Sequence, residues 1–132
     1  SAKSPIRRHG GTIFGPQMRD HSFRLNKKTK KLATRSVFAE KVRNDDVFIL
    51  ENLSLPDNKT KSLIKILKNL DLTEKILIVA DGINENLQLA SRNLSHVNVL
   101  SYRSLNIYEI MRHKKVLFIK DAIEEFKGRL SI

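Results

Sequence analysis

A glycine-rich segment close to the start of the chain contains the residues whose types and spacing could bind phosphate. It reads GGTIFGP over residues 10–16 and directly follows a basic segment, SPIRRH. Two chemistries use such residues: a loop that holds the phosphate of a nucleotide, and an extended arm that lies along a nucleic acid. The segment matches neither GxxxxGK[ST] nor GxGxxG and follows no predicted strand, which argues against a nucleotide-binding loop. The pair Asp81-Gly82 does follow a predicted strand, but its single glycine favours a plain turn.

The positive charge of the chain is concentrated in its first third. The net charge is +11 over 132 residues. Residues 1–45 contain 12 Lys and Arg against three acidic residues, whereas residues 46–132 contain 13 against 11. Unbalanced positive charges repel one another in a compact state unless counter-ions or a polyanion offset them. We therefore expect a polyanionic partner for residues 1–45, with nucleic acid the first candidate and an anionic membrane the second.

The first 25 residues are predicted to form an extended basic arm. They hold three of the five glycines and two of the three prolines, and no helical or alternating period runs through them. A segment without an apolar face becomes ordered by binding a partner. Phe14 and Phe23 lie among arginines, a mixture that can stack on unpaired bases while the arginines hold phosphates. Anchoring of the arm to the folded domain is an equally good interpretation of either ring.

The candidate RNA-contacting residues precede the predicted body of the protein. The basic candidates are Lys3, Arg7, Arg8, His9, Arg19, Arg24, Lys27, Lys28, Lys30, Lys31 and Arg35. Gly10, Gly11 and Gly15 would let the backbone approach RNA closely. Five of the basic candidates crowd the first turns of a helix predicted over residues 26–44, with Asn26 as its N-cap. The helix dipole disfavours positive charge at that end, so we expect these side chains to serve an external anion.

The remaining chain alternates apolar strands with helices. Short apolar runs predict buried strands at residues 46–51, 75–80, 96–101 and 115–120. Helices are predicted from Asp57 or Asn58 to Leu70, from about Asn84 to Leu94, after an Asn106 cap, and from Asp121 onward. Strands that are apolar on both faces and separated by helices are typical of a parallel sheet covered on two sides. We expect a three-layer αβα domain over residues 26–132, with a mostly parallel four-stranded sheet and residues 26–44 as a linking helix.

The sequence lacks the patterns of an enzyme, a metal site or a membrane protein. There is no cysteine, the four histidines are scattered without zinc-ligand spacing, and no GxSxG motif is present. We therefore expect no catalytic residues, no metal and no cofactor. The longest uninterrupted apolar stretch, residues 76–80, is far shorter than the roughly 20 residues of a membrane-spanning helix. A soluble intracellular protein with no membrane partner is expected.

Residues 10–20, with the pattern GGxxFGPxxRD, carry the most specific resemblance to a known family. With SFRLNKKTKKLATRS and AEK after them, they closely resemble the second half of the central extension and the following helix of the bacterial-type large-subunit ribosomal protein L-four family (universal uL-four). KTKSLIKILKNL, KILIVADG, NLQLASRNL, LNIYEIMRH and KDAIEEFKGRL fit the same family in the same order. His9 stands where the family usually has another glycine. The family's N-terminal third has no counterpart, so we expect Ser1 to fall close to the tip of the extension.

The resemblance implies a structural protein of the large ribosomal subunit. In the family a globular α/β domain lies on the subunit surface, while a basic extension penetrates the rRNA and helps to line the peptide exit tunnel. The implied partners are large-subunit (23S-type) rRNA and other large-subunit ribosomal proteins, and the implied location is the cytoplasmic ribosome, with an organelle ribosome left open. The alternative is a free RNA-binding regulator that represses its own operon through the mRNA leader. It would use the same basic surface.

Overall fold

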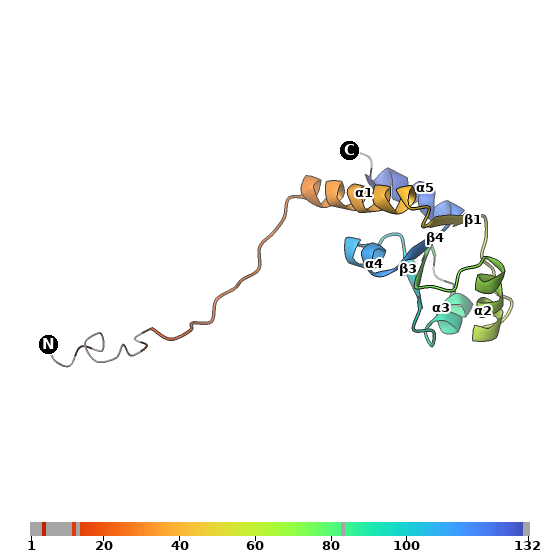
Figure 1. Cartoon of the computed structure of the whole chain (residues 1–132), viewed down its shortest axis with the longest axis horizontal. Helices are drawn as coiled ribbons and strands as arrows, with labels where there is room; N and C mark the ends of the chain where they lie inside the picture. The colour runs from red at the N-terminus through yellow and green to blue at the C-terminus, as the bar shows by residue number, and fades with distance from the viewer. Residues whose placement is uncertain (1–3, 5–11, 13, 83, 131–132) are drawn as a thin grey trace.

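A parallel four-stranded sheet forms the centre of the computed structural model (Figure 1). The structure describes residues 4, 12, 14–82 and 84–130. The strands are β1 (Val47–Leu50), β2 (Ile76–Ala80), β3 (Val97–Ser101) and β4 (Lys115–Ile119). Their order across the sheet is β1-β4-β2-β3, and every pairing between these strands is parallel. In the register, Val116 of β4 is flanked by Val47 of β1 and Leu77 of β2.

Helices cover both faces of this sheet, which confirms the predicted three-layer α/β fold. They are α1 (Lys27–Arg43), α2 (Thr60–Asn69), α3 (Glu85–Ser91), α4 (Ile107–Arg112) and α5 (Lys120–Leu130). On one face α2 packs beside α3, and on the other α1 packs beside α4 and α5 (Figure 1). A strand, a helix and a parallel strand in succession form a crossover unit, and such units place helices on the faces of a sheet.

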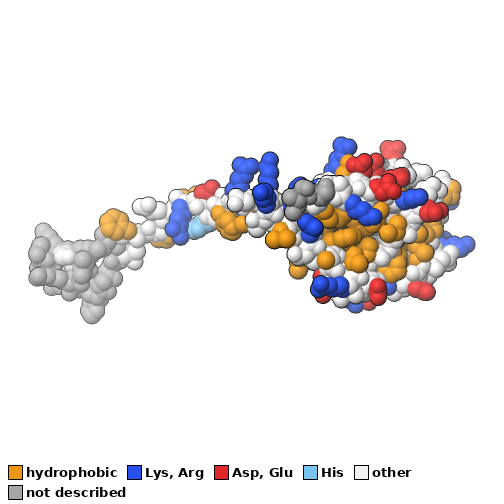
Figure 2. Space-filling view, turned by 90° about the horizontal axis from the view of Figure 1, so that it is seen from above, with side chains coloured by type: hydrophobic (Ala, Val, Ile, Leu, Met, Phe, Trp, Pro, Cys, Tyr) orange, Lys and Arg blue, Asp and Glu red, His pale blue; other side chains and the backbone are white. Residues whose placement is uncertain are grey.

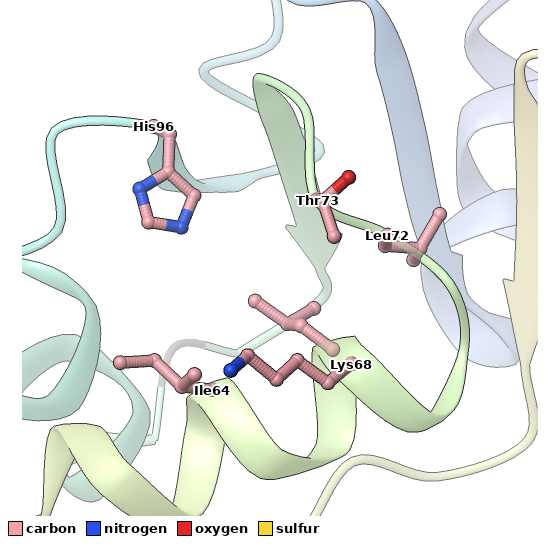
Figure 3. A pocket seen from close by; sticks show the side chains of 6 residues that line it. Ile64, Lys68, Leu72, Thr73 and His96 are labelled. Carbon is pink, nitrogen blue, oxygen red and sulfur yellow. The ribbon is translucent and has the colours of Figure 1, made fainter.

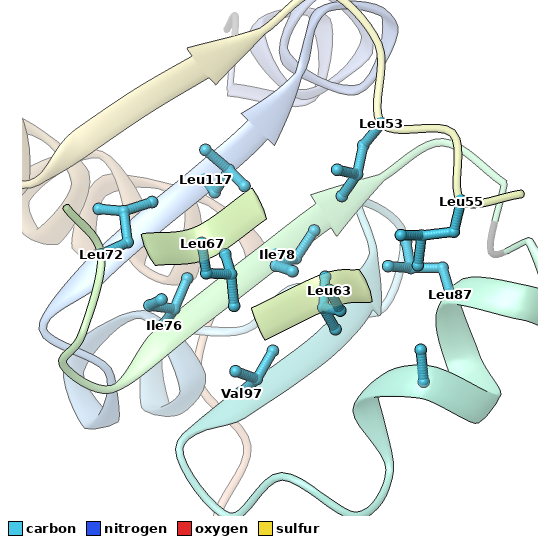
Figure 4. Packing of buried hydrophobic residues seen from close by; sticks show 11 residues of the cluster. Leu53, Leu55, Leu63, Leu67, Leu72, Ile76, Ile78, Leu87, Val97 and Leu117 are labelled. Atoms are coloured by element: carbon cyan, nitrogen blue, oxygen red, sulfur yellow. The ribbon is translucent and has the colours of Figure 1, made fainter. Parts of the chain in front are cut away.

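Alternate side chains of the central strands build a separate apolar core on each face. Leu63 of α2 and Ile78 of β2 belong to the core under α2 and α3 (Figure 4). Leu77 of β2 and Phe118 of β4 belong to the core under α4 and α5. Every residue of β2 is at most 1% exposed. Because β2 is covered on both faces it is apolar throughout, as strands in the interior of parallel sheets are.

Helix starts agree with the sequence-based expectation where a side chain caps the helix. Asn106 precedes α4, and its side-chain oxygen accepts a hydrogen bond from the Glu109 backbone N–H at 2.9 Å, which confirms the predicted cap. Asn26 stands at the N-cap position of α1, but its side chain makes no capping hydrogen bond. α5 begins at Lys120 directly after β4, so Asp121 lies in its first turn instead of preceding it.

The predicted start of α2 near Asp57 is wrong, because the helix begins at Thr60. The segment before it is an irregular connection held by two buried side chains. Leu53 is 3% exposed and Leu55 is 8% exposed, and both belong to the core under α2. Both leucines precede Pro56, so their burial accounts for the irregular backbone before Pro56 and not for the start of the helix at Thr60.

Candidate nucleic-acid interface

The second half of α1 anchors this helix to the body. The Phe38 ring centroid lies 5.7 Å from that of Phe118 and 5.3 Å from that of Phe126, both in edge-to-face geometry. Such aromatic pairs are worth about 0.5–1.5 kcal/mol beyond the area that they bury. The Lys41 ammonium donates a hydrogen bond to the Lys114 carbonyl oxygen at 2.7 Å. These contacts fix the direction in which the first half of the helix leaves the body.

The first half of α1 carries the basic side chains predicted to contact RNA. Lys27, Lys28, Lys30, Lys31 and Arg35 are all exposed. No acidic residue lies in the first turn, and no residue of α1 is classed as buried. The leucine of this half is uncovered as well, since Leu32 is 62% exposed. Lysines at the positive end of the helix dipole do not stabilise the helix, so their placement needs a reason outside it.

Residues 14–26 continue from α1 as an extended segment that runs away from the body (Figures 1 and 2). The segment contains no helix or strand, and each of its residues is exposed. Phe14 is 85% exposed and Phe23 is 83% exposed. Neither ring therefore anchors the arm to the body. Stacking on bases stays a prediction for both rings, and their exposure leaves their faces open to it.

The carboxylate of Asp20, the acidic residue of the arm, accepts hydrogen bonds within a local turn. The Ser22 backbone N–H donates to Asp20 Oδ1 at 2.8 Å, and the Ser22 hydroxyl donates to Asp20 Oδ2 at 2.9 Å. These hydrogen bonds, the backbone one first, lower the pKa of the Asp20 carboxyl. Within the described residues no ion pair joins Arg19 or Arg24 to an acidic side chain. The two guanidinium groups are therefore available to an external anion.

Gly15 shows no requirement for glycine within the protein itself. A Cβ atom added there would meet no atom within 4 Å apart from those of Gly15 and its two chain neighbours. The fold alone would therefore accept alanine at this position. A close approach by another molecule would not, which is consistent with the prediction that the backbone meets RNA here.

The described candidate residues form one continuous exposed stretch, which we call the arm surface. It consists of Phe14, Gly15, Arg19, Phe23, Arg24, Lys27, Lys28, Lys30, Lys31 and Arg35. Figure 2 shows Lys and Arg side chains along the arm and where it meets the body, whereas the visible face of the body mixes both signs of charge. Six predicted residues, Lys3, Arg7, Arg8, His9, Gly10 and Gly11, lie outside the described residues.

Reasoning from charge totals passed over one basic surface on the body. Residues 46–132 are nearly neutral in sum, yet α2 contains Lys61, Lys65 and Lys68 and no acidic residue. The signal was present in the sequence as a spacing of four and then three residues. It was hidden by adding this helix to acidic segments elsewhere in the body.

The described part of the chain offers no group of residues typical of a metal centre. No three His, Cys, Asp or Glu residues gather there in a way that could hold a metal ion. Among the same residues, no helix has the length and apolar content that crossing a membrane requires.

Comparison with known proteins identifies similar sequences over nearly the whole chain. A family model described as the ribosomal protein L4/L1 family matches residues 1–129. The large ribosomal subunit protein uL4 of Moorella thermoacetica is 41% identical over 123 residues, which cover 93% of this chain and 59% of the relative. The protein of the same name from Cytophaga hutchinsonii is 41% identical over 132 residues, covering 99% and 64%. The chain thus spans about three fifths of the length of the curated relatives that it matches.

Proposed function

The chain belongs to the ribosomal protein L4/L1 family, and on this premise we propose that it is a structural constituent of the large ribosomal subunit and not an enzyme. The relatives at about 40% identity are described as large ribosomal subunit protein uL4. The observation that supports this role most strongly is the arm surface, which is basic, exposed and projects from the body.

In this proposal the chain consists of two parts with different roles. Residues 1–25 form the arm, and residues 26–132 form the α/β domain with residues 26–44 as the linking helix. The basic side chains of the arm surface contact rRNA phosphates, which position the protein. Phe14 and Phe23 stack on unpaired bases, and Gly15 allows a close backbone approach. Sequence preference then comes from the shape of the RNA and a few unstacked bases.

The same proposal gives the protein a place in the subunit. The arm lies within the large-subunit (23S-type) rRNA and contributes to the peptide exit tunnel. The body lies nearer the surface of the subunit and contacts other large-subunit ribosomal proteins. The location is the cytoplasmic ribosome.

The salt dependence of RNA binding tests the proposal. If the arm surface contacts 6–10 phosphates, the affinity should fall by about 10³–10⁵-fold between 50 and 200 mM salt. Binding releases counter-ions from the RNA, and a higher salt concentration makes that release less favourable. The measurement is the equilibrium affinity of the full chain for large-subunit rRNA freed of protein, at several salt concentrations. An affinity that stays constant over this range would contradict the proposal.

The alternative of a free regulator acting on its own mRNA leader uses the same arm surface, and no feature of the described residues favours it over the ribosomal role. Sedimentation of the native protein separates the two. A protein that sediments with large subunits supports the ribosomal role, and a protein that remains free while repressing its own mRNA supports regulation.

A further inference from the structure

Three lysines of α2 form a row on the side of the helix that faces away from the core. Lys61, Lys65 and Lys68 follow the i, i+4, i+7 spacing, which at about 100° per residue places them within an arc of roughly 60°. Leu63 and Leu67, which are 0% and 2% exposed, lie on the opposite side of the helix and enter the core (Figure 4). All three lysines are exposed. We call this row the α2 lysine face.

The α2 lysine face is not neutralised within the described part of the protein. No ion pair or side-chain hydrogen bond there involves any of its three lysines. The body does pair other lysines: the Lys114 ammonium donates to Glu74 Oε1 at 2.7 Å. The charge of this face is therefore available to a partner of opposite sign.

The stability of α2 does not account for the lysine at its start, whereas Lys68 in its last turn suits the helix dipole. Its first turn contains Lys61 and no acidic residue, against the preference of the helix dipole. The first turns of α3, α4 and α5 each contain an acid, Glu85, Glu109 and Asp121 respectively. Among the helices of the described residues, only α1 and α2 break this pattern, and both carry clustered lysines.

A cavity with a mainly apolar lining lies at the C-terminal end of α2, and two basic side chains border it. It has a volume of about 170 Å³ and is lined by Ile64, Leu67, Lys68, Leu72, Thr73 and His96. Figure 3 shows Lys68 on α2 and His96 on the opposite side of the opening, just before β3. The side chains of Lys68 and His96 thus border one opening, and an ammonium or an imidazole N–H can donate a hydrogen bond to a phosphate or ribose oxygen.

We propose that the α2 lysine face, continued by His96, is a second RNA-contacting surface that binds the phosphate backbone of a helical RNA segment. Lysines on flexible side chains act as point charges and suit phosphates without reading sequence. α2 carries no aromatic side chain that could stack on a base, in contrast to the arm. Double-stranded RNA is recognised mainly through its shape and its backbone, which such a surface matches. The inference rests on the proposed RNA-binding function and adds a second point of contact to it.

The experiment compares two matched double variants of the full chain. The test variant is Lys61→Gln/Lys65→Gln, and the control is Lys120→Gln/Lys127→Gln on α5, whose exposed lysines lie among three acidic residues. Each variant removes two positive charges, and glutamine is a good helix former.

Binding to large-subunit rRNA freed of protein is measured at several salt concentrations. We expect the slope of log affinity against log salt to become shallower by about 2 in the test variant, about 1 for each lost phosphate contact. The control should keep the wild-type slope. The variant Lys61→Arg/Lys65→Arg, which keeps both positive charges, should also show the wild-type slope.

Three results would contradict the inference or its premise, the third being a special case of the first. Equal slopes in the test and control variants would overturn the α2 surface and leave the arm proposal standing. A wild-type protein without salt-dependent RNA binding would overturn the proposed function itself. A test variant that keeps the RNA slope but no longer binds an acidic ribosomal protein would replace RNA by protein as the partner of this face. Circular dichroism of each variant establishes that the helices remain folded.

Discussion

The arm and the body treat the same residue types in opposite ways. In the body, Phe118 is 0% exposed and Phe126 is 1% exposed, whereas Phe14 in the arm is 85% exposed. Lys114 of the body has an acidic partner, while Arg19 of the arm has none within the described residues. These body residues are therefore satisfied within the fold, whereas Phe14 and Arg19 of the arm are left for another molecule. This contrast teaches that the residues that make the fold stable and those proposed to bind RNA are largely separate sets.

The largest effect that separates the two regions is on stability. Phe118→Ala should lower the free energy of unfolding by about 3–5 kcal/mol, because it leaves a cavity in the core under α4 and α5. Phe14→Ala should leave this free energy unchanged, because the ring is exposed. Denaturant unfolding followed by circular dichroism checks both. Similar losses in the two variants would show that the arm contributes to the fold.

The second effect is on RNA affinity, and here the arm variants should be affected although their stability is not. Phe14→Ala and Phe23→Ala should each weaken binding to rRNA by about 1–3 kcal/mol if each ring stacks on a base. Phe→Tyr at the same positions is the control, since it keeps a ring that can stack. Titration with rRNA at fixed salt measures the loss. Unchanged affinity in both alanine variants would leave the rings without a role in binding.

The third effect compares the starts of two helices, one in the body and one next to the arm. Asn106→Ala should destabilise the protein by about 1 kcal/mol, because the Asn106 side chain caps α4. Asn26→Ala should cost less, because the Asn26 side chain makes no capping bond. Thermal unfolding of the pair gives the difference. A larger loss of stability for Asn26→Ala than for Asn106→Ala would contradict the prediction, because it would mean that the Asn26 side chain stabilises the start of α1.

The smallest effect is a pH dependence confined to the body surface. The hydrogen bond from Lys114 lowers the pKa of the Glu74 carboxyl below its ordinary value of 4.5. A carboxyl whose pKa is lower in the folded state adds stability above its unfolded pKa, and that stability is lost as the pH falls through the folded value. Glu74→Gln should therefore reduce stability slightly at neutral pH and not below the folded pKa. Unfolding curves at pH 7 and in acid measure this, and an equal effect at both would exclude the ion pair as the cause.

The fold followed from the sequence because its strands are short apolar runs with clear ends. The run over residues 76–80 is buried on both faces, so its composition alone indicated an interior parallel strand. The strand order could not be predicted in the same way. Val47 of β1 pairs with Val116 of β4, although most of the sequence of the body lies between them. No local sequence pattern indicates which strands pair over such a separation. The start of α2 was missed because Pro56 and Asp57 are typical of a helix start, and no local pattern marked Lys59 as the residue before the helix.

The candidate site was predictable in part, and for a different reason. The arm residues stand out by composition, since residues 1–45 contain 12 Lys and Arg against three acidic residues. The sequence could not predict that these residues are exposed. The structure shows that neither Phe14 nor Phe23 packs the arm onto the body. The α2 lysine face was missed because a sum of charges over 87 residues conceals a helix that is basic on one side.

Incorporation of a charge-reversed arm into ribosomes tests the central claim most directly. The variant changes Arg19, Arg24, Lys27 and Lys28 to Glu, all at exposed positions outside both cores. Its body should unfold at the same denaturant concentration as the wild type, while the variant protein should be missing from purified large subunits. A variant that enters large subunits at the wild-type level would contradict the account, because the arm would then bind there without its positive charge.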